Sequence, residues 1–282
     1  MSWYKKYLSV YEKPFNEVPQ ETINLIWEKI RNIQSTVPLV SVVLIAHNEE
    51  KHLLSCLWSL SENNCKYPIE IIGINNNSTD RTEEILKESG IRVFNETKKG
   101  PGHARQCGLD HAKGKYHVCI DSDTIYPPYY IQTMVDGLIK NNALGVYSLW
   151  SFLPDENHSK FGLFIYESLR DIHLKIQNIK RPELSVRGMT FAFVTEYGRK
   201  IGFRTDIIRG EDGSLAYGLM DYGKIKFITS RKARPITSNG TLNADGSFFN
   251  SFKFRFVKFL KGLGSYFTSK DEYKDEDSNL IK

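Results

Sequence analysis

Long apolar runs are what this 282-residue sequence lacks most clearly. The longest such run, Val42 to Ala46, has five residues, whereas a membrane-spanning helix needs about 20. The first six residues, Met1 to Lys6, contain no apolar core of the kind that a secretory signal requires. We therefore expect neither a membrane span nor a signal peptide, and we expect a cytoplasmic protein.

Cysteine is scarce, and it follows no metal-binding or disulfide pattern. The sequence has four cysteines and no C-x-x-C pair: Cys56, Cys65, Cys107 and Cys119. We interpret them as reduced thiols of a cytosolic protein. Cys56 and Cys107 fall on apolar helix faces, so core packing is the expected role of both.

A strong excess of one charge is also missing. The 38 basic and 33 acidic residues give a net charge of +5, with 40% hydrophobic and 25% charged residues. These ordinary values exclude a disordered chain or a coiled-coil rod. The mild basicity is compatible with a phosphate-bearing partner without requiring one. Nucleic acid is the weakest candidate, because basic residues gather only near the C-terminus and an acidic tail follows them.

The chain divides into four stretches by composition. Residues 1–37 form an arm in which apolar residues recur at helical spacing from Glu21 onward. Residues 38–247 form the main domain, with halves at 38–125 and 126–247. An aromatic and basic segment follows at 248–269. The acid-rich tail 270–282 is expected to be disordered.

Strand and helix patterns alternate from residue 39 to residue 120. Short β-rich runs stand at 39–46, 70–74, 91–94 and 116–120, separated by helical patterns at 53–60, 80–86 and 102–112. This alternation predicts an α/β fold with a doubly wound, mostly parallel sheet and helices on both faces. Ligands of such sheets bind at the carboxyl ends of the strands.

Asp121-Ser122-Asp123 is the sharpest local feature, because it directly follows the last of these strands. If the backbone stays extended, both carboxylates point to the same face. Paired carboxylates repel each other unless a cation joins them, and Mn²⁺ or Mg²⁺ binds one or two carboxylates together with substrate phosphates. An isolated D-x-D is more often a surface turn, but its position at a strand end favours a metal site.

Three further segments carry polar groups at strand or helix ends. Asn75 to Asp80 ends the second strand, and its amides can recognise a nucleobase, although turn and cap chemistry explains it equally simply. Lys98 to Arg105 combines glycines with a helix start, which suits a phosphate. A surface salt bridge is as good an explanation for Arg105. Gly210 to Gly213 contains Glu211 and Asp212, for which helix capping is the simpler interpretation when the segment is taken alone.

These motifs, in this order, resemble glycosyltransferase family 2, the inverting nucleotide-sugar enzymes of the GT-A fold. Val40 to Glu50 is similar to the family's first strand and N-E loop, Asn75 to Asp80 to its V-D-D-G-S-T-D turn, and Gly102 to Gly108 to its G-x-x-x-A-R-N-x-G helix. Asp121 to Asp123 resembles its D-x-D and Glu211-Asp212 its late acidic pair. The resemblance covers roughly residues 38–235.

The resemblance implies a role for each matching residue. Asp212 would be the catalytic base, supported by Glu211. The donor site would comprise Ala46, Asn48, Glu49, Asn75, Arg105, Asp121, Ser122 and Gly188. Asp123, together with Asp121, would hold Mn²⁺ or Mg²⁺. Within the donor site, Asn75 would face the base, Arg105 would lie near the nucleotide or diphosphate, and Arg187-Gly188 would lie near the transferred sugar or the acceptor.

Two departures from the family pattern bear on specificity. The family usually has Asp where this chain has Asn75, so the identity of the base stays open between uracil and guanine. The Q-x-x-R-W motif of processive members is absent, and Arg231 to Arg234 stands in that region without a tryptophan. We therefore expect transfer of single sugars from a UDP- or GDP-linked donor to a saccharide or lipid-linked saccharide, in surface polysaccharide or glycolipid synthesis.

Alternatives of a different class remain at this level. The chain could be a catalytically silent nucleotide-sugar or membrane-surface binding module, or a nucleotidyltransferase. Residues 248–267 contain eight aromatic and four basic residues and no acid. They suit an in-plane helix on the anionic inner face of a membrane, but packing of the phenylalanines against the core explains them equally well.

Overall fold

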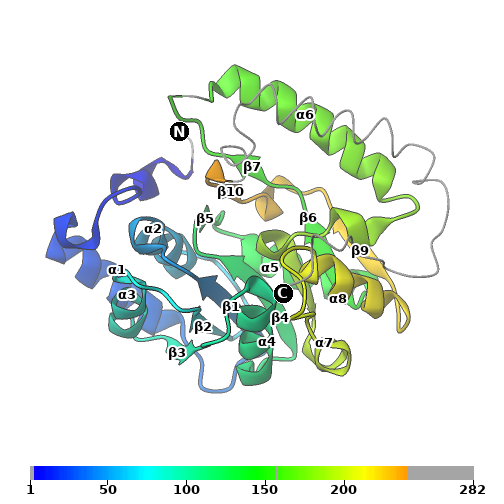
Figure 1. The fold of residues 1–282 in the computed structure, drawn as a ribbon, viewed down its shortest axis with the longest axis horizontal. Helices are drawn as coiled ribbons and strands as arrows, with labels where there is room; N and C mark the ends of the chain where they lie inside the picture. Colours follow the sequence, from blue (N-terminus) through cyan, green and yellow to red (C-terminus); the bar gives the residue numbers. More distant parts are fainter. Residues whose placement is uncertain (1–2, 157, 241–282) are drawn as a thin grey trace.

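The computed structural model describes residues 3–156 and 158–240 (Figure 1). The predicted aromatic and basic segment at 248–269 and the predicted tail at 270–282 lie outside these residues. Among the helices of the described part, none combines the length and the hydropathy that a membrane crossing requires.

A seven-stranded sheet forms the centre of the molecule, in the order β3-β2-β1-β4-β8-β6-β9. Its strands are β1 (Val40–Ala46), β2 (Ile69–Asn75), β3 (Arg92–Asn95), β4 (Tyr116–Asp121), β6 (Gly145–Ser148), β8 (Phe191–Val194) and β9 (Ile225–Ile228). β1 to β4 are mutually parallel, and only β8 runs antiparallel to its neighbours β4 and β6. The predicted doubly wound, mostly parallel sheet is confirmed.

Helices cover both faces of this sheet, because successive residues of its buried strands point to opposite sides. Val42 and Leu44 of β1 belong to the core that includes α2 and α5, whereas Val43 between them packs with Ala104 of α4. The helices are α2 (Glu50–Ser61), α3 (Thr82–Glu88), α4 (Pro101–His111), α5 (Tyr130–Asn141), α7 (Thr195–Ile201) and α8 (Glu211–Met220).

A second, smaller sheet and one long helix lie beyond the carboxyl end of β4. The small sheet has the order β5-β10-β7, formed by β5 (Thr124–Ile125), β10 (Ile236–Thr237) and β7 (Ser151–Phe152). The helix α6 (Lys160–Gln177) lies beside β7 at one side of the molecule, away from the main sheet (Figure 1). The 3₁₀ turns η3 (Pro182–Ser185), η4 (Gly188–Thr190) and η5 (Arg231–Ala233) connect the remaining elements.

The N-terminal arm packs against the main domain. It consists of two 3₁₀ turns, η1 (Lys5–Ser9) and η2 (Phe15–Glu17), and the amphipathic helix α1 (Gln20–Ile33). Ile26 and Ile30 of α1 are fully buried in the same core as α2. The helix predicted in the arm from its apolar spacing is therefore confirmed.

One local prediction was wrong. The backbone is not extended through the D-x-D, because β4 ends at Asp121 and the next two residues form a turn into β5. The cap chemistry expected at the end of Asn75 to Asp80 is present, although Arg81 occupies the residue directly before α3. The carboxylate of Asp80 accepts hydrogen bonds from the amides of Thr82 and Glu50, at 3.0 Å each, and so links the starts of α3 and α2.

Candidate active site

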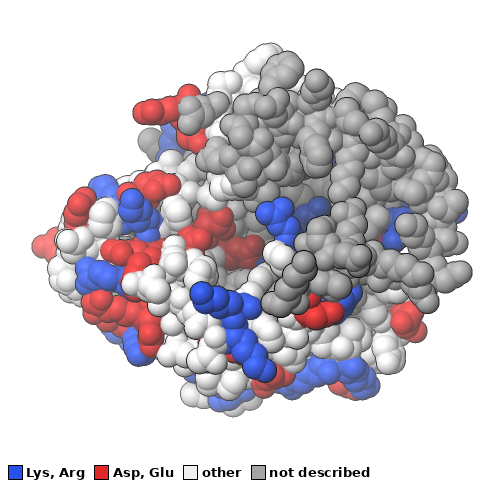
Figure 2. All heavy atoms as spheres, in the orientation of Figure 1, with Lys and Arg blue, Asp and Glu red and all other residues white. Residues whose placement is uncertain are grey.

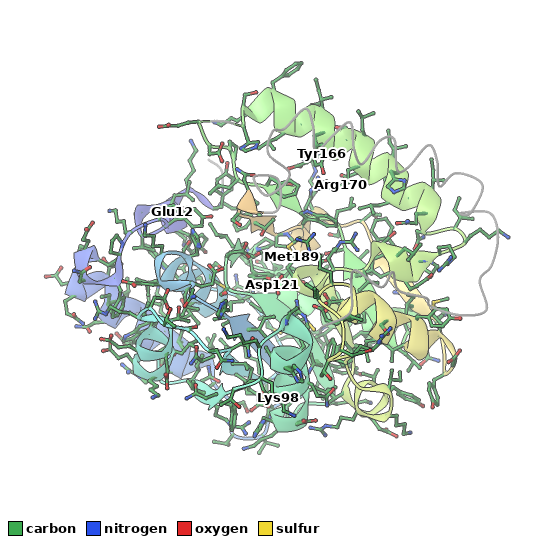
Figure 3. All side chains as sticks on the ribbon, in the orientation of Figure 1. Glu12, Lys98, Asp121, Tyr166, Arg170 and Met189 are labelled. Atoms are coloured by element: carbon green, nitrogen blue, oxygen red, sulfur yellow. The ribbon has the colours of Figure 1, made fainter. Side chains whose placement is uncertain are left out.

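Three strand ends and the start of α8 meet at one edge of the main sheet. Ala46 at the end of β1 pairs with Asn75 of β2, and Ile45 pairs with Asp121 of β4, so the carboxyl ends of these strands are level. Figure 3 places Asp121 near the centre of the molecule, close to Met189. Acidic side chains gather near the middle of the same view in Figure 2. The predicted strand-end location of the site therefore has a geometric basis.

A buried arginine joins the acidic residues of this edge. Arg105 of α4 is only 4% exposed. Its Nη2 donates to Oδ1 of Asp121 at 2.8 Å, and its Nε lies 2.9 Å from Oδ1 of Asp212 and 3.3 Å from Oε1 of Glu211. Burial alone would lower the pKa of Arg105, but the carboxylates outweigh burial and raise it, so the guanidinium stays charged. One cation thus holds three carboxylates from β4 and α8.

Asp212 has the electrostatics of a proton acceptor. It is the second residue of α8, which follows Gly210 at φ 98°, a left-handed conformation that suits glycine. Burial raises the pKa of Asp212 to about 8, with Arg105 opposing the rise and Glu211 and Asp121 adding to it. The capping interpretation of Asp212 is wrong, because the N-cap of α8 is Gly210. A carboxyl group with a pKa near neutrality suits general base catalysis.

Gly188 packs directly against this pair. A Cβ atom on Gly188 would lie 1.6 Å from Nη2 of Arg105 and 2.8 Å from Oδ2 of Asp212. The Gly188 backbone also forms a hydrogen bond with the Asp212 carboxylate. A side chain here would displace the guanidinium, so only glycine allows η4 to approach the charged cluster.

Asp123 lies in the turn beyond β4, where hydroxyl groups surround it. Its carboxylate accepts hydrogen bonds from Ser238 at 2.5 Å and from Thr124 at 3.0 Å. Burial raises the pKa of Asp123, and the nearby charge of Asp121 adds to this rise. A bound cation would offset both effects. The two aspartates therefore come close together, although the turn and not an extended strand achieves this.

The donor set suits a hard divalent cation that also binds substrate. Within residues 3–156 and 158–240, no group of three or more His, Cys, Asp or Glu side chains is arranged to hold a metal ion. Mn²⁺ and Mg²⁺ sites at phosphate substrates commonly use only one or two carboxylates, with phosphate oxygens completing the shell. Asp121 and Asp123 fit that pattern.

The N-terminal arm reaches the site through a histidine that sequence reasoning missed. Nδ1 of His52 lies 2.7 Å from Oε2 of Glu49, and Nε2 lies 2.9 Å from Oε1 of Glu12 in the arm. Burial alone would lower the pKa of His52, but these two hydrogen bonds raise it to about 9. The ring of Tyr11 lies against the imidazole of His52, with the ring centroids 4.8 Å apart and the planes tilted by 36°, and the pKa of Tyr11 is raised by burial and then by Asp123.

Glu49 lies beside the two aspartates. Burial raises its pKa, with Asp123 and Asp121 adding to the rise and His52 opposing it. The i, i+3 spacing of Glu49 and His52 was a possible signal of their contact. The contribution of Glu12 has no such signal, because it depends on how the arm folds back.

Asparagines organise the loops that follow β1 and β2. Asn48 has φ 56°, and its Oδ1 accepts a hydrogen bond from the amide of Thr79 at 2.7 Å. Nδ2 of Asn75 donates to Asn95 at 3.1 Å, and its Oδ1 accepts from the amide of Ser78 at 3.3 Å. Both amide atoms of Asn75 thus have protein partners, and its predicted contact with a base stays a prediction.

The glycine-rich loop is held by an asparagine that we did not single out. Oδ1 of Asn76 accepts from the amide of Gly100 at 3.0 Å, and its Nδ2 donates to the carbonyl of Lys98 at 2.7 Å. A Cβ on Gly102 would lie 2.1 Å from the carbonyl oxygen of Arg204. Gly102 therefore serves close backbone packing here. Ala46 and Ser122 are 3% and 4% exposed, buried at the strand ends where the donor site was predicted.

Comparison with known proteins places these features in a family context. The sequence profile of Glycosyl transferase family 2 matches residues 41–196. An uncharacterized glycosyltransferase of Methanocaldococcus jannaschii is 32% identical over 127 residues, which are 43% of this chain and 44% of that protein. An uncharacterized glycosyltransferase of Haemophilus influenzae is 29% identical over 132 residues, which are 43% of this chain and 51% of that protein. The chain spans about half the length, or less, of the first curated relatives that it matches.

Solved structures share the fold at low sequence identity. A mannosyltransferase from Pyrobaculum calidifontis, in complex with GDP-Man and Mn²⁺, has a TM-score of 0.59 and 17% identity, covering 89% of this chain and 73% of that chain. Glucosyl-3-phosphoglycerate synthase from Mycobacterium tuberculosis, in complex with Mn²⁺, UDP-glucose and phosphoglyceric acid, has a TM-score of 0.53 and 23% identity. The match covers 88% of this chain and 86% of that chain.

Proposed function

Because this chain belongs to glycosyl transferase family 2 and has the GT-A fold, we propose that it transfers one sugar at a time from a UDP- or GDP-linked donor to a saccharide or lipid-linked saccharide, with inversion. One observation carries this proposal. Asp212 is buried, has a pKa of about 8, and shares Arg105 with Asp121 at the strand ends. A base tuned toward neutrality supports catalysis rather than nucleotide binding alone.

In the proposed mechanism, Asp212 accepts the proton of the attacking acceptor hydroxyl. A single displacement at the anomeric carbon, through an oxocarbenium-like transition state, inverts the configuration. Arg105, which also pairs with Glu211, holds the Asp212 carboxylate in place, and Gly188 provides the space for that arrangement. The reaction belongs to surface polysaccharide or glycolipid synthesis.

The donor would bind across the strand ends. Ala46, Asn48, Glu49, Asn75 and Ser122 are proposed to line its nucleotide and sugar. Asp121 and Asp123 would hold Mn²⁺ or Mg²⁺, which neutralises charge on the leaving diphosphate when bound. The raised pKa of Asp123 and its closeness to Asp121 support this assignment.

Nucleotide binding provides the direct test. We expect UDP or GDP to raise the melting temperature with Mn²⁺ present, and CDP and TDP to have little effect. A ligand at 100 times its Kd stabilises the folded state by about 2.7 kcal/mol, which corresponds to a shift of several degrees. Asp123→Asn should abolish the Mn²⁺-dependent part, whereas the exposed control Asp206→Asn should not. No shift with any of the four nucleotides would contradict the proposal.

The pH dependence of the reaction follows from Asp212. A base must be deprotonated to act, and the pKa of Asp212 in the donor-free protein is about 8. We therefore expect kcat/KM to rise with pH through about 8, by up to tenfold per pH unit below that value. Initial rates between pH 5.5 and 9.5 at low donor concentration measure this. A profile that is flat from pH 6 to 9 would place the base elsewhere.

A further inference from the structure

The outward face of α6 carries a continuous apolar stripe. Helical spacing aligns seven large apolar side chains along the helix and the residues just after it, and each is between 38% and 73% exposed: Phe161, Phe164, Ile165, Leu169, Ile172, Ile176 and Ile179. Contiguous exposed apolar surface of this kind marks an interaction site in soluble proteins. Scattered exposed residues would need no such explanation.

The inward face of α6 is packed against a separate hydrophobic cluster. Leu163, Tyr166 and Leu174 are buried in a cluster with Trp150 and Phe152 of the neighbouring strand region. Figure 3 shows Tyr166 and Arg170 on the side of α6 that faces the rest of the protein. The outer stripe is therefore additional to what the fold of α6 requires.

The charges of α6 are sorted between these two faces. Both of its acids point inward: Arg234 lies 2.8 Å from Oε2 of Glu167 and 2.7 Å from Oδ2 of Asp171. Arg170 also contacts Asp171, at 2.8 Å. The exposed charges of the helix itself are Lys160 and Lys175, and Lys180 follows just beyond its end, whereas the exposed acids Asp155 and Glu156 lie before its start. The outer surface of α6 is thus apolar and basic.

The end of the described chain lies close to the start of α6. Nδ2 of Asn239 donates to the carbonyl of Leu153 and to the carboxylate of Asp155, both at 2.6 Å, just before the helix begins. The sequence that follows includes 248–267, with eight aromatic and four basic residues and no acid.

We propose that the outer face of α6 docks in the plane of an anionic lipid bilayer. The apolar stripe enters the headgroup–acyl boundary, and the lysines contact anionic headgroups. A second copy of α6, or the segment 248–267, would bring basic residues against basic residues, so the charge pattern favours an anionic lipid surface. The docking implies a lipid-linked acceptor only if the proposed function holds, whereas the docking itself needs no sugar transfer.

Co-sedimentation of the full chain with vesicles tests this surface. We expect binding to phosphatidylglycerol-containing vesicles and little binding to phosphatidylcholine alone. Phe164→Ser combined with Ile172→Ser should lower partitioning about tenfold or more, and Lys175→Gln combined with Lys180→Gln roughly 25-fold. Val37→Ser, the same kind of apolar-to-serine change at a residue outside α6 that is 81% exposed, should alter it less than twofold. Unchanged binding in both double variants would overturn the proposal.

A polarity-sensitive fluorophore distinguishes the bilayer from other occupants. It is attached at Phe164→Cys in a chain that also carries Cys65→Ser and Cys107→Ser, which leaves only the buried cysteines. We expect emission typical of water in buffer, and a blue shift with anionic vesicles. Emission that is already blue-shifted in buffer and unaffected by vesicles would show that protein covers α6, and would overturn the proposal. Neither readout requires donor or acceptor, so failure here leaves the nucleotide-binding test unaffected.

Discussion

Asp212→Asn is expected to lower kcat by about 10³-fold while the donor still binds, because general base catalysis contributes roughly 10² to 10⁴ to such rates. The variant should fold normally. With a pKa of about 8, Asp212 is mostly protonated in the donor-free protein at pH 7, and asparagine has a similar size and no charge. The remaining partners of Arg105, Asp121 and Glu211, stay in place.

Two measurements separate loss of the base from loss of the site. Nucleotide-dependent thermal shifts should be the same in the variant and in the unaltered protein, and the rise of kcat/KM through pH 8 should disappear. Asp206→Asn is the matched control, since Asp206 is an exposed acid that pairs with Arg204 at 2.6 Å. Retention of most activity by Asp212→Asn would show that another group accepts the proton.

Most of the sheet could be predicted because its determinants are local. β1 and β2 are short apolar runs, and the helices between the strands have apolar faces at helical spacing. The parallel order follows from the alternation itself. The antiparallel strand β8 had no comparable signal, because its place between β4 and β6 depends on pairing over long sequence separations.

The individual motifs of the candidate site could be predicted, but the contacts between them could not. Asp121, Asp123, Arg105 and Asp212 were each identified, but nothing in their spacing showed that one buried arginine joins three carboxylates. That contact depends on α4, β4 and α8 meeting in space. The hydrogen bond from the Ser238 hydroxyl to Asp123 depends on the pairing of β10 with β5 and β7. These strands have two residues each, which is too short to leave a sequence pattern.

In the N-terminal arm, too, the helix could be predicted from local sequence, but a tertiary contact could not. Helix α1 was predictable from its apolar stripe, whose members are now buried in the core. The contact of Glu12 with His52 was not, because it joins an irregular turn to α2 across 40 residues. The pKa of about 9 for His52 arises from that contact and from Glu49, so it is a property of the folded chain.

Arg105→Met should destabilise the protein by about 3–5 kcal/mol at pH 8, the usual cost of removing one partner from a buried charge cluster. The variant keeps a long apolar stem but leaves Asp121, Glu211 and Asp212 without their cation. Chemical denaturation at several pH values measures the loss. Arg204→Met is the matched control, because the pair of Arg204 and Asp206 is at the surface, where ion pairs contribute about 0–1 kcal/mol.

The sign of the pH effect distinguishes charge from packing in Arg105→Met. Without the guanidinium, which opposes the rise, the folded-state pKa of Asp212 moves further above its unfolded value. Groups with raised folded-state pKa values bind more protons in the folded state, so stability is lost as pH rises and recovered as pH falls. The deficit relative to the unaltered protein should therefore shrink between pH 8 and pH 5. A deficit that is constant across this range would mean that Arg105 contributes through its packing, and that Asp212 does not depend on its charge.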